Sequence, residues 1–181
     1  MNGAAPAPAT ALKNAADPVI AVIGNPNTGK STLFNALTGL RQKTANYPGV
    51  TVERHTGHIK LDGHNVTLVD LPGAYSIAAQ SPDEMVAIDV LLGHVEDLPR
   101  PRAVLAVVDA TNLRRNLFLV TQLAELGLPM VIGLNMTDLA AVKGIEVDIA
   151  ALGAGLGAEV VALSAARGTG LDELRRALAT A

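Results

Sequence analysis

Short apolar runs alternate with amphipathic stretches along most of this sequence. The runs at 19–23, 103–108, 130–134 and 159–163 are rich in Val, Ile, Leu and Ala, a composition typical of parallel strands buried on both faces. Between these runs, apolar residues recur every three or four positions and predict helices, the first over residues 30–37 with Gly39 after it. This alternation predicts a doubly wound α/β sheet with helices on both faces.

A hairpin signal adds two strands to this sheet. The segments 54–61 and 64–69 flank Asp62-Gly63, which is a strong signal for a two-residue turn. We therefore expect a mostly parallel, six-stranded sheet with one antiparallel strand at its edge. The polar segment 41–52 is predicted to be a loop.

Two other segments have clear local signals. Residues 81–84 form a capping box with proline at the first helical position, and the helix that follows is expected to bury Met85, Ile88 and Leu92. Residues 1–17 are rich in Ala and Pro and lack an amphipathic period, so they are predicted to be a disordered tail. Residues 18–181 then form a single folded domain.

A glycine-containing segment follows the first predicted strand and carries the strongest chemical signal. It reads Gly24-Asn25-Pro26-Asn27-Thr28-Gly29-Lys30-Ser31, with Thr32 after it, and matches the phosphate-binding loop G-x-x-x-x-G-K-[ST]. Backbone N–H groups and the helix N-terminus surround phosphates in such a loop. Lys30 adds positive charge at the β- and γ-phosphates, and the Ser31 hydroxyl is a suitable ligand for Mg²⁺.

Three more motifs follow the ends of predicted strands. Asp70-Leu71-Pro72-Gly73 matches D-x-x-G, in which the carboxylate can hold Mg²⁺ through water and the Gly73 N–H can meet the γ-phosphate. In the loop that contains Gly49, Val50 and Thr51, Thr51 is the expected switch residue, which would complete Mg²⁺ coordination only with GTP bound.

The base is expected at the other two motifs. The carboxylate of Asp138, in Asn135-Met136-Thr137-Asp138, can accept from guanine N1–H and N2–H₂, a donor pair that adenine lacks. Asn135 can brace the base loop against the phosphate loop. The backbone N–H groups of Ser164-Ala165-Ala166 can donate to guanine O6. Together the motifs predict a Ras-like P-loop GTPase fold, with GTP as substrate and GDP as product.

These motifs also resemble one family. The phosphate loop, 46–53 (Asn-Tyr-Pro-Gly-Val-Thr-Val-Glu), 70–76 (Asp-Leu-Pro-Gly-Ala-Tyr-Ser), 108–117 and 135–138 are similar to the G domain of the ferrous iron transport protein B family. Met136 stands where most G proteins have Lys, as is typical of that family, and its side chain can lie on the guanine face. The resemblance covers the chain from about Val19 onward.

The resemblance implies a GTPase domain on the cytoplasmic face of the bacterial inner membrane. The expected partner is the membrane permease region of an Fe²⁺ transporter, and a homo-oligomer is expected only for the full-length protein. The family's helical and membrane domains are absent from the sequence, so we expect a fragment that does not itself enter the membrane. His55, His58, His64 and His94 are interpreted as surface residues rather than an Fe²⁺ site.

Two features concern hydrolysis. Ala74 follows the D-x-x-G motif, where many G proteins have a Gln that orients the attacking water, so slow turnover is expected. Asn27 resembles the Asn of potassium-activated G proteins, in which K⁺ takes the place of an arginine finger. The catalytic candidates are Asn27, Lys30, Thr51 and Gly73.

Composition limits the alternatives. The 181 residues include 49% apolar residues, 2% aromatic residues and no Cys, and the net charge is −3. No apolar run is long enough to span a membrane, and an acidic chain with few aromatic residues is a poor nucleic-acid binder. Two other hypotheses remain, a nucleotide-sensing module with negligible turnover and a ribosome- or RNA-associated GTPase.

Overall fold

The computed structural model describes residues 17–39, 42–78 and 81–181, in which seven strands form one sheet in the order β2-β3-β4-β1-β5-β6-β7. β3 pairs antiparallel with β2 and β4, and the pairs β1–β4, β1–β5, β5–β6 and β6–β7 are all parallel. Residues 1–16 of the predicted tail lie outside the described residues. The strands are β1 Val19–Gly24, β2 Gln42–Asn46, β3 Glu53–Leu61, β4 His64–Asp70, β5 Ala103–Asp109, β6 Met130–Asn135 and β7 Glu159–Ala162.

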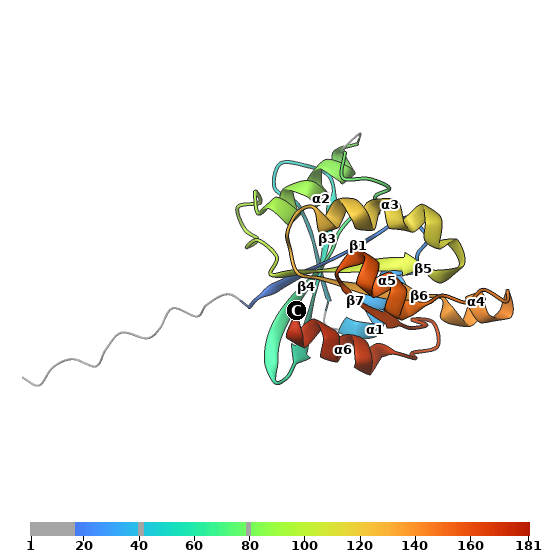
Figure 1. Ribbon diagram of the computed structural model, residues 1–181. Helices are drawn as coiled ribbons and strands as arrows, with labels where there is room; N and C mark the ends of the chain where they lie inside the picture. Colours follow the sequence, from blue (N-terminus) through green and yellow to red (C-terminus); the bar gives the residue numbers. More distant parts are fainter. Residues whose placement is uncertain (1–16, 40–41, 79–80) are drawn as a thin grey trace, which may run out of the picture.

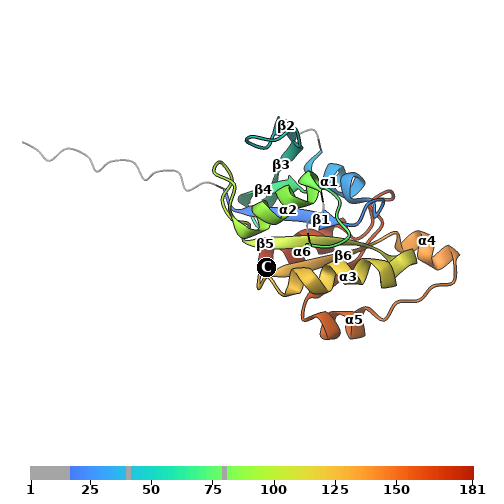
Figure 2. The same cartoon turned by 90° about the horizontal axis from the view of Figure 1, so that it is seen from above.

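Helices cover both faces of this sheet, as Figure 1 and Figure 2 show. α1 and α6 pack on one face, and α2 and α3 pack on the other. Alternate residues of β1 point to the two cores, with Ala21 and Ile23 toward α2 and α3, and Ile20 and Val22 toward α1 and α6. The predicted α/β fold is confirmed. The helices are α1 Lys30–Thr38, α2 Pro82–Leu92, α3 Leu113–Ala124, α4 Thr137–Val142, α5 Ile149–Leu156 and α6 Leu171–Thr180, with a 3₁₀ turn Ala110–Asn112 before α3.

β2 is a strand that the sequence pattern does not predict. All five of its residues are exposed, so they show no alternation of buried and solvent-facing positions. Within the described part of the chain, β2 pairs with β3 alone, and Thr44 lies opposite His55. The described residues therefore form a sheet of seven strands where six were expected, and the antiparallel strand β3 lies one place in from the edge.

The predicted hairpin joins β3 to β4. Its turn residues Asp62 and Gly63 have φ values of 48° and 82°, the left-handed pair that a two-residue hairpin turn requires. The register places Leu61 opposite His64 across this turn. Here the local turn signal was sufficient to predict the structure.

α2 begins as predicted but buries a different face. The Ser81 hydroxyl accepts a hydrogen bond from the Glu84 N–H at 3.2 Å. Met85 and Leu92, which were expected to be buried, are 59% and 40% exposed. The helix is apolar on more than one side, so tertiary contacts select the buried face. Its buried residues are Val86, Ala87, Val90 and Leu91.

Gly57 allows α1 to lie directly on β3, so a larger residue at this position should destabilise the fold. A Cβ atom at Gly57 would lie 2.7 Å from Thr38 Cβ, closer than two carbon atoms approach. Gly57→Ala is expected to lower the free energy of unfolding by about 1–3 kcal/mol, as overpacking does. Chemical denaturation measures this change.

Gly155→Ala in α5 is the matched control, because among the described residues no atom outside this turn of the helix lies within 4 Å of a Cβ placed there. This variant is expected to gain about 0.5 kcal/mol from helix propensity. Equal stabilities of the two variants would contradict the packing argument.

Candidate nucleotide-binding site

The four predicted motifs meet at one edge of the sheet. β1, β4, β6 and β7 run parallel, so their carboxyl ends lie on the same side. The phosphate loop follows β1, Asp70 ends β4, Asn135 ends β6, and Ser164 lies just past β7. Ligands of doubly wound sheets bind beyond this edge, so the structure brings the predicted residues together where a ligand is expected.

The phosphate loop takes the tight path that its glycines predict. Asn27 and Gly29 have φ values of 66° and 78°, and the Thr28 hydroxyl donates to the Asn25 carbonyl at 2.9 Å. A Cβ atom at Gly24 would lie 2.5 Å from the Val107 carbonyl oxygen of β5, so a side chain does not fit there without a shift of the backbone. The loop leaves Pro26 and Asn27 exposed at its tip.

An ion pair joins the start of α1 to the end of β4. Lys30 Nζ contacts Asp70 Oδ1, and the two side chains are only 12% and 11% exposed. Ser31 and Thr32, in the first turn of α1, are exposed. Hydroxyl and carboxylate oxygens are the ligands that Mg²⁺ prefers, so Ser31 and Asp70 form a donor set that fits this ion.

The D-x-x-G segment lies against the phosphate loop. The Ala74 N–H donates to the Gly24 carbonyl at 3.2 Å. A Cβ atom at Gly73 would lie 3.3 Å from the Pro26 ring, so glycine allows a close approach of the two segments. The Ala74 side chain is buried at 2% exposure and presents no polar group toward the site.

The side chain of Asn135 connects three segments. Its Nδ2 donates to the Thr28 carbonyl and its Oδ1 accepts from the Ala165 N–H, both at 2.9 Å. Asn135 is 3% exposed, so these bonds are made away from water. The predicted brace between the base loop and the phosphate loop is present, and it also includes the segment after β7.

Asp138 lies in the first turn of α4 and is held by two neighbours. A side-chain hydrogen bond from Ser164, and then the charge of Arg167, lower the pKa of Asp138, so its carboxylate is ionised at neutral pH. Arg167 Nε lies 3.0 Å from Asp138 Oδ2. Met136 precedes α4 with φ 62°, and its methyl carbon is 3.5 Å from where a Cβ of Gly29 would stand. The segment predicted to bind the base therefore lies next to the phosphate loop.

The segment 164–166 offers fewer free donors than the sequence suggests. The Ser164 N–H donates to the Thr169 carbonyl at 3.1 Å, and the Ala165 N–H is used by Asn135. Among the described residues, Ala166 N–H has no such acceptor. Two of the three N–H groups expected to be available to guanine O6 therefore stabilise the loop itself, and the role of the segment in base binding stays a prediction.

The segment predicted to switch is anchored at its first residue. Tyr47 is 2% exposed, its N–H donates to the Val52 carbonyl at 3.0 Å, and burial raises the pKa of its hydroxyl to about 12. Gly49, Val50 and Thr51 are exposed. Thr51 lines a surface hollow with Pro82 of α2, and no hydrogen bond within the described ranges joins it to the phosphate loop. The switch role of Thr51 stays a prediction.

Two arginines near the site were missed by sequence reasoning. Arg54 donates to both carboxylate oxygens of Asp97 at 2.8 Å, and its guanidinium lies 5.6 Å from the centre of the Tyr47 ring. The other is Arg167. No spacing rule joins residues 43 positions apart, as Arg54 and Asp97 are. For Arg167, its position directly after the segment 164–166 could have indicated that it lies near the site.

Comparisons with known proteins all identify the same family. Residues 18–178 match the family model described as ferrous iron transport protein B. The chain is 48% identical over 163 residues to the Fe(2+) transporter FeoB of Shigella flexneri and 47% identical to that of Salmonella typhimurium. Each match covers 88% of this chain but only 20% of the relative. No helix in the described ranges is long and apolar enough to cross a bilayer.

Solved structures show the same similarity. The FeoB G domain from Methanococcus jannaschii is 43% identical, with a TM-score of 0.78 over 91% of this chain and 96% of that one. An S. thermophilus NFeoB N11A mutant bound to mGDP is 46% identical, with a TM-score of 0.83 over 91% of this chain and 61% of that one. The T. maritima cytosolic domain in its GMPPNP form is 37% identical, with a TM-score of 0.84 over 90% of this chain and 63% of that one.

The Asn135 brace can be tested without any ligand. Asn135→Ala would leave the Thr28 carbonyl and the Ala165 N–H buried without their partner. We expect the free energy of unfolding to fall by about 2–4 kcal/mol. The matched control Asn65→Ala changes an exposed residue of β4 and is expected to stay within about 0.5 kcal/mol of the parent. A loss no greater than that of the control would show that the brace contributes little.

Proposed function

Because this chain belongs to the ferrous iron transport protein B family, we propose that it binds GTP and hydrolyses it slowly to GDP and phosphate. The single observation that carries the proposal is the Asn135 side chain, which holds the phosphate loop and the base-reading loop in one rigid arrangement. A site built this way suits a ligand with a phosphate group at one end and a base at the other.

Asp138 is the residue proposed to select guanine. Its ionised carboxylate accepts from N1–H and N2–H₂ of guanine, whereas adenine presents no donor pair at that edge. Ala166 N–H is the donor proposed for O6, because Ser164 and Ala165 use theirs within the protein. The methyl end of the Met136 side chain lies close to Gly29, and this side chain is proposed to cover one face of the base.

The phosphate end uses the loop and the residues around it. The backbone N–H groups of the loop after Pro26 and the Lys30 ammonium are proposed to bind the β- and γ-phosphates. Ser31 and Asp70 would hold Mg²⁺, with Thr51 as a further ligand, and the ion when bound neutralises charge on the phosphate oxygens. Lys30 must then exchange its contact with Asp70 for the phosphates. The Gly73 N–H is proposed to donate to the γ-phosphate.

The chain lacks a side chain to orient the attacking water after D-x-x-G. Ala74 occupies that position and points into the protein. We therefore propose intrinsic turnover on the order of 10⁻³ s⁻¹, as in unaided G proteins. The same observation favours a second candidate, a nucleotide sensor whose output is closure of Thr51 and Gly73 around GTP and whose turnover is negligible.

The wider role is the switch domain of a bacterial Fe²⁺ transporter. The relatives are Fe(2+) transporters, and this chain spans about a fifth of their length. The partner proposed for the switch is the membrane permease region of such a protein, at the cytoplasmic face of the inner membrane. Nucleotide state would pass to that region through movement of 48–51 and of the segment after Gly73.

Potassium is proposed to supply the positive charge that an arginine finger supplies elsewhere. Asn27 is exposed at the tip of the phosphate loop with a left-handed backbone, so its amide oxygen is available to a cation beside the phosphates. We expect GTP hydrolysis to be at least about tenfold faster in KCl than in NaCl, part of the 10³–10⁵ that an arginine finger provides. Phosphate release under multiple turnover measures this rate.

Asn27→Ala should abolish the difference between the two salts while GDP binding is kept. Equal turnover of the parent in both salts would contradict the potassium role. If that shared rate were far below the rate of nucleotide release, the sensor hypothesis would be favoured.

Asp138→Asn tests the base-reading role. In this variant an NH₂ group replaces one carboxylate oxygen. It cannot accept from guanine N2–H₂, but it can donate to the C2 carbonyl of xanthine. We expect GTP affinity to fall about a hundredfold, as an unpaired donor requires, and XTP affinity to rise. Competition with a fluorescent nucleotide measures both, with ATP as the reference. An unchanged preference for GTP over XTP and ATP would show that Asp138 does not read the base.

A further inference from the structure

Arg167 and Asp138 form an ion pair within the site proposed for the base. The Nε–Oδ2 distance is 3.0 Å, and the side chains are 65% and 17% exposed. Arg167 belongs to a turn that a bridge between Ser164 and Thr169 closes. The pair therefore links this turn to α4, next to the carboxylate that is proposed to select guanine.

Arg167 offers Asp138 the same chemical group that guanine does. The recognised edge of guanine, N1–H with N2–H₂, is part of a guanidine unit, and an arginine side chain ends in a guanidinium ion. Both present parallel N–H donors in one plane, the arrangement that a carboxylate accepts best. Arg167 Nε already occupies Oδ2, one of the two oxygens that guanine would need for its pair of donors, and Ser164 also hydrogen-bonds to this carboxylate.

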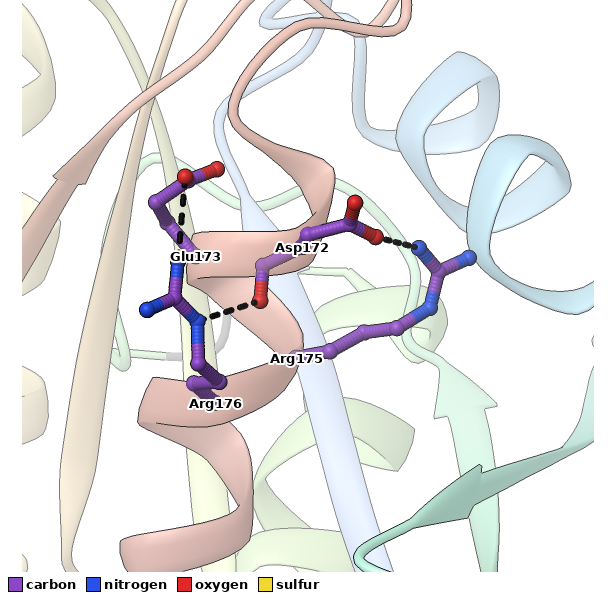
Figure 3. Close-up of polar contacts among 4 residues, drawn as sticks. All are labelled: Asp172, Glu173, Arg175 and Arg176. Atoms are coloured by element: carbon purple, nitrogen blue, oxygen red, sulfur yellow. Dashed lines mark hydrogen bonds and ion pairs between the residues drawn. The ribbon is translucent and has the colours of Figure 1, made fainter.

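The neighbouring arginines have other partners. Arg175 pairs with Asp172 at 3.1 Å and Arg176 pairs with Glu173 at 3.0 Å along α6, as Figure 3 shows. Lys30 contacts Asp70 at the phosphate end of the site. Within the described residues, Arg167 is the cation that pairs with Asp138.

We propose that Arg167 is an internal competitor for guanine at Asp138, so that guanine nucleotide binds only as Arg167 leaves the carboxylate. This inference rests on the proposed base-reading role of Asp138. The long, exposed side chain of Arg167 can move away at small cost, because exposed ion pairs are weak and salt screens them. Arg167 thus lowers the affinity for guanine nucleotides without changing which base is chosen.

Arg167→Gln is the direct test, with the dissociation constant for GDP measured by titration calorimetry. Removal of the competitor is expected to lower this constant about two- to fivefold, the range for an exposed ion pair. Salt should remove this difference because it screens the ion pair. With K⁺ held fixed, the dissociation constants of parent and variant for GDP should become equal as NaCl is raised from about 0.05 M to about 0.5 M. Arg175→Gln removes the same charge from α6 and is expected to leave GDP binding unchanged.

A double-mutant cycle shows whether Arg167 acts through Asp138. In the Asp138→Asn background, Arg167→Gln should leave the affinity for XDP unchanged. The proposal would be overturned if Arg167→Gln raised the affinity for XDP in that background as much as it raises the affinity for GDP in the parent. It would also be overturned if the single Arg167→Gln variant bound GDP no more tightly than the parent. A weaker-binding variant would mean that Arg167 supports the base instead.

The cycle also separates this proposal from the function on which it rests. If Asp138→Asn turns the preference from guanine to xanthine while Arg167→Gln has no effect on GDP binding, only the competitor role is wrong. If Asp138→Asn does not change the preference, the base-reading role is wrong and the competitor role with it.

Discussion

One buried amide, that of Asn135, fixes the relative positions of three loops. The sheet brings the ends of β1, β6 and β7 to the same edge, but parallel strands alone do not set the distance between the loops that follow them. Asn135 sets it by donating to Thr28 and accepting from Ala165. Because both bonds are buried, either loop can shift only by leaving a polar group unpaired, which costs about 1–3 kcal/mol.

The charges of the site are arranged as pairs around this fixed frame. Lys30 is paired with Asp70 at the phosphate end, and Arg167 with Asp138 at the base end. Each pair joins a group proposed to bind the ligand to a group of opposite charge on another loop. Binding is then an exchange of partners rather than the burial of isolated charges, which keeps the cost of desolvation low. It also means that affinity depends on how easily each internal partner leaves.

The sequence predicted the parts of this structure that depend on local signals. The phosphate loop, the Asp62-Gly63 turn and the capped start of α2 each rest on a few adjacent residues, and all are present. The strand β2 was not predictable because its residues are all exposed, so no alternation of buried and solvent-facing positions marks it as a strand. The buried face of α2 was misassigned because the helix is apolar on several sides. The two ion pairs of Arg54 and Arg167 join distant segments, which no pattern along the chain connects.

The two ends of the site differ in how much they can move. The base end is held by Asn135 and by the closed turn from Ser164 to Thr169. At the phosphate end, the exposed residues 48–51 lie between buried Tyr47 and Arg54, which is tied to Asp97. A short exposed segment between two anchors has few contacts to lose, so it belongs to the least stable part of the fold. We therefore expect backbone movement on the side where a terminal phosphate would lie, while at the base end only the exposed Arg167 side chain moves.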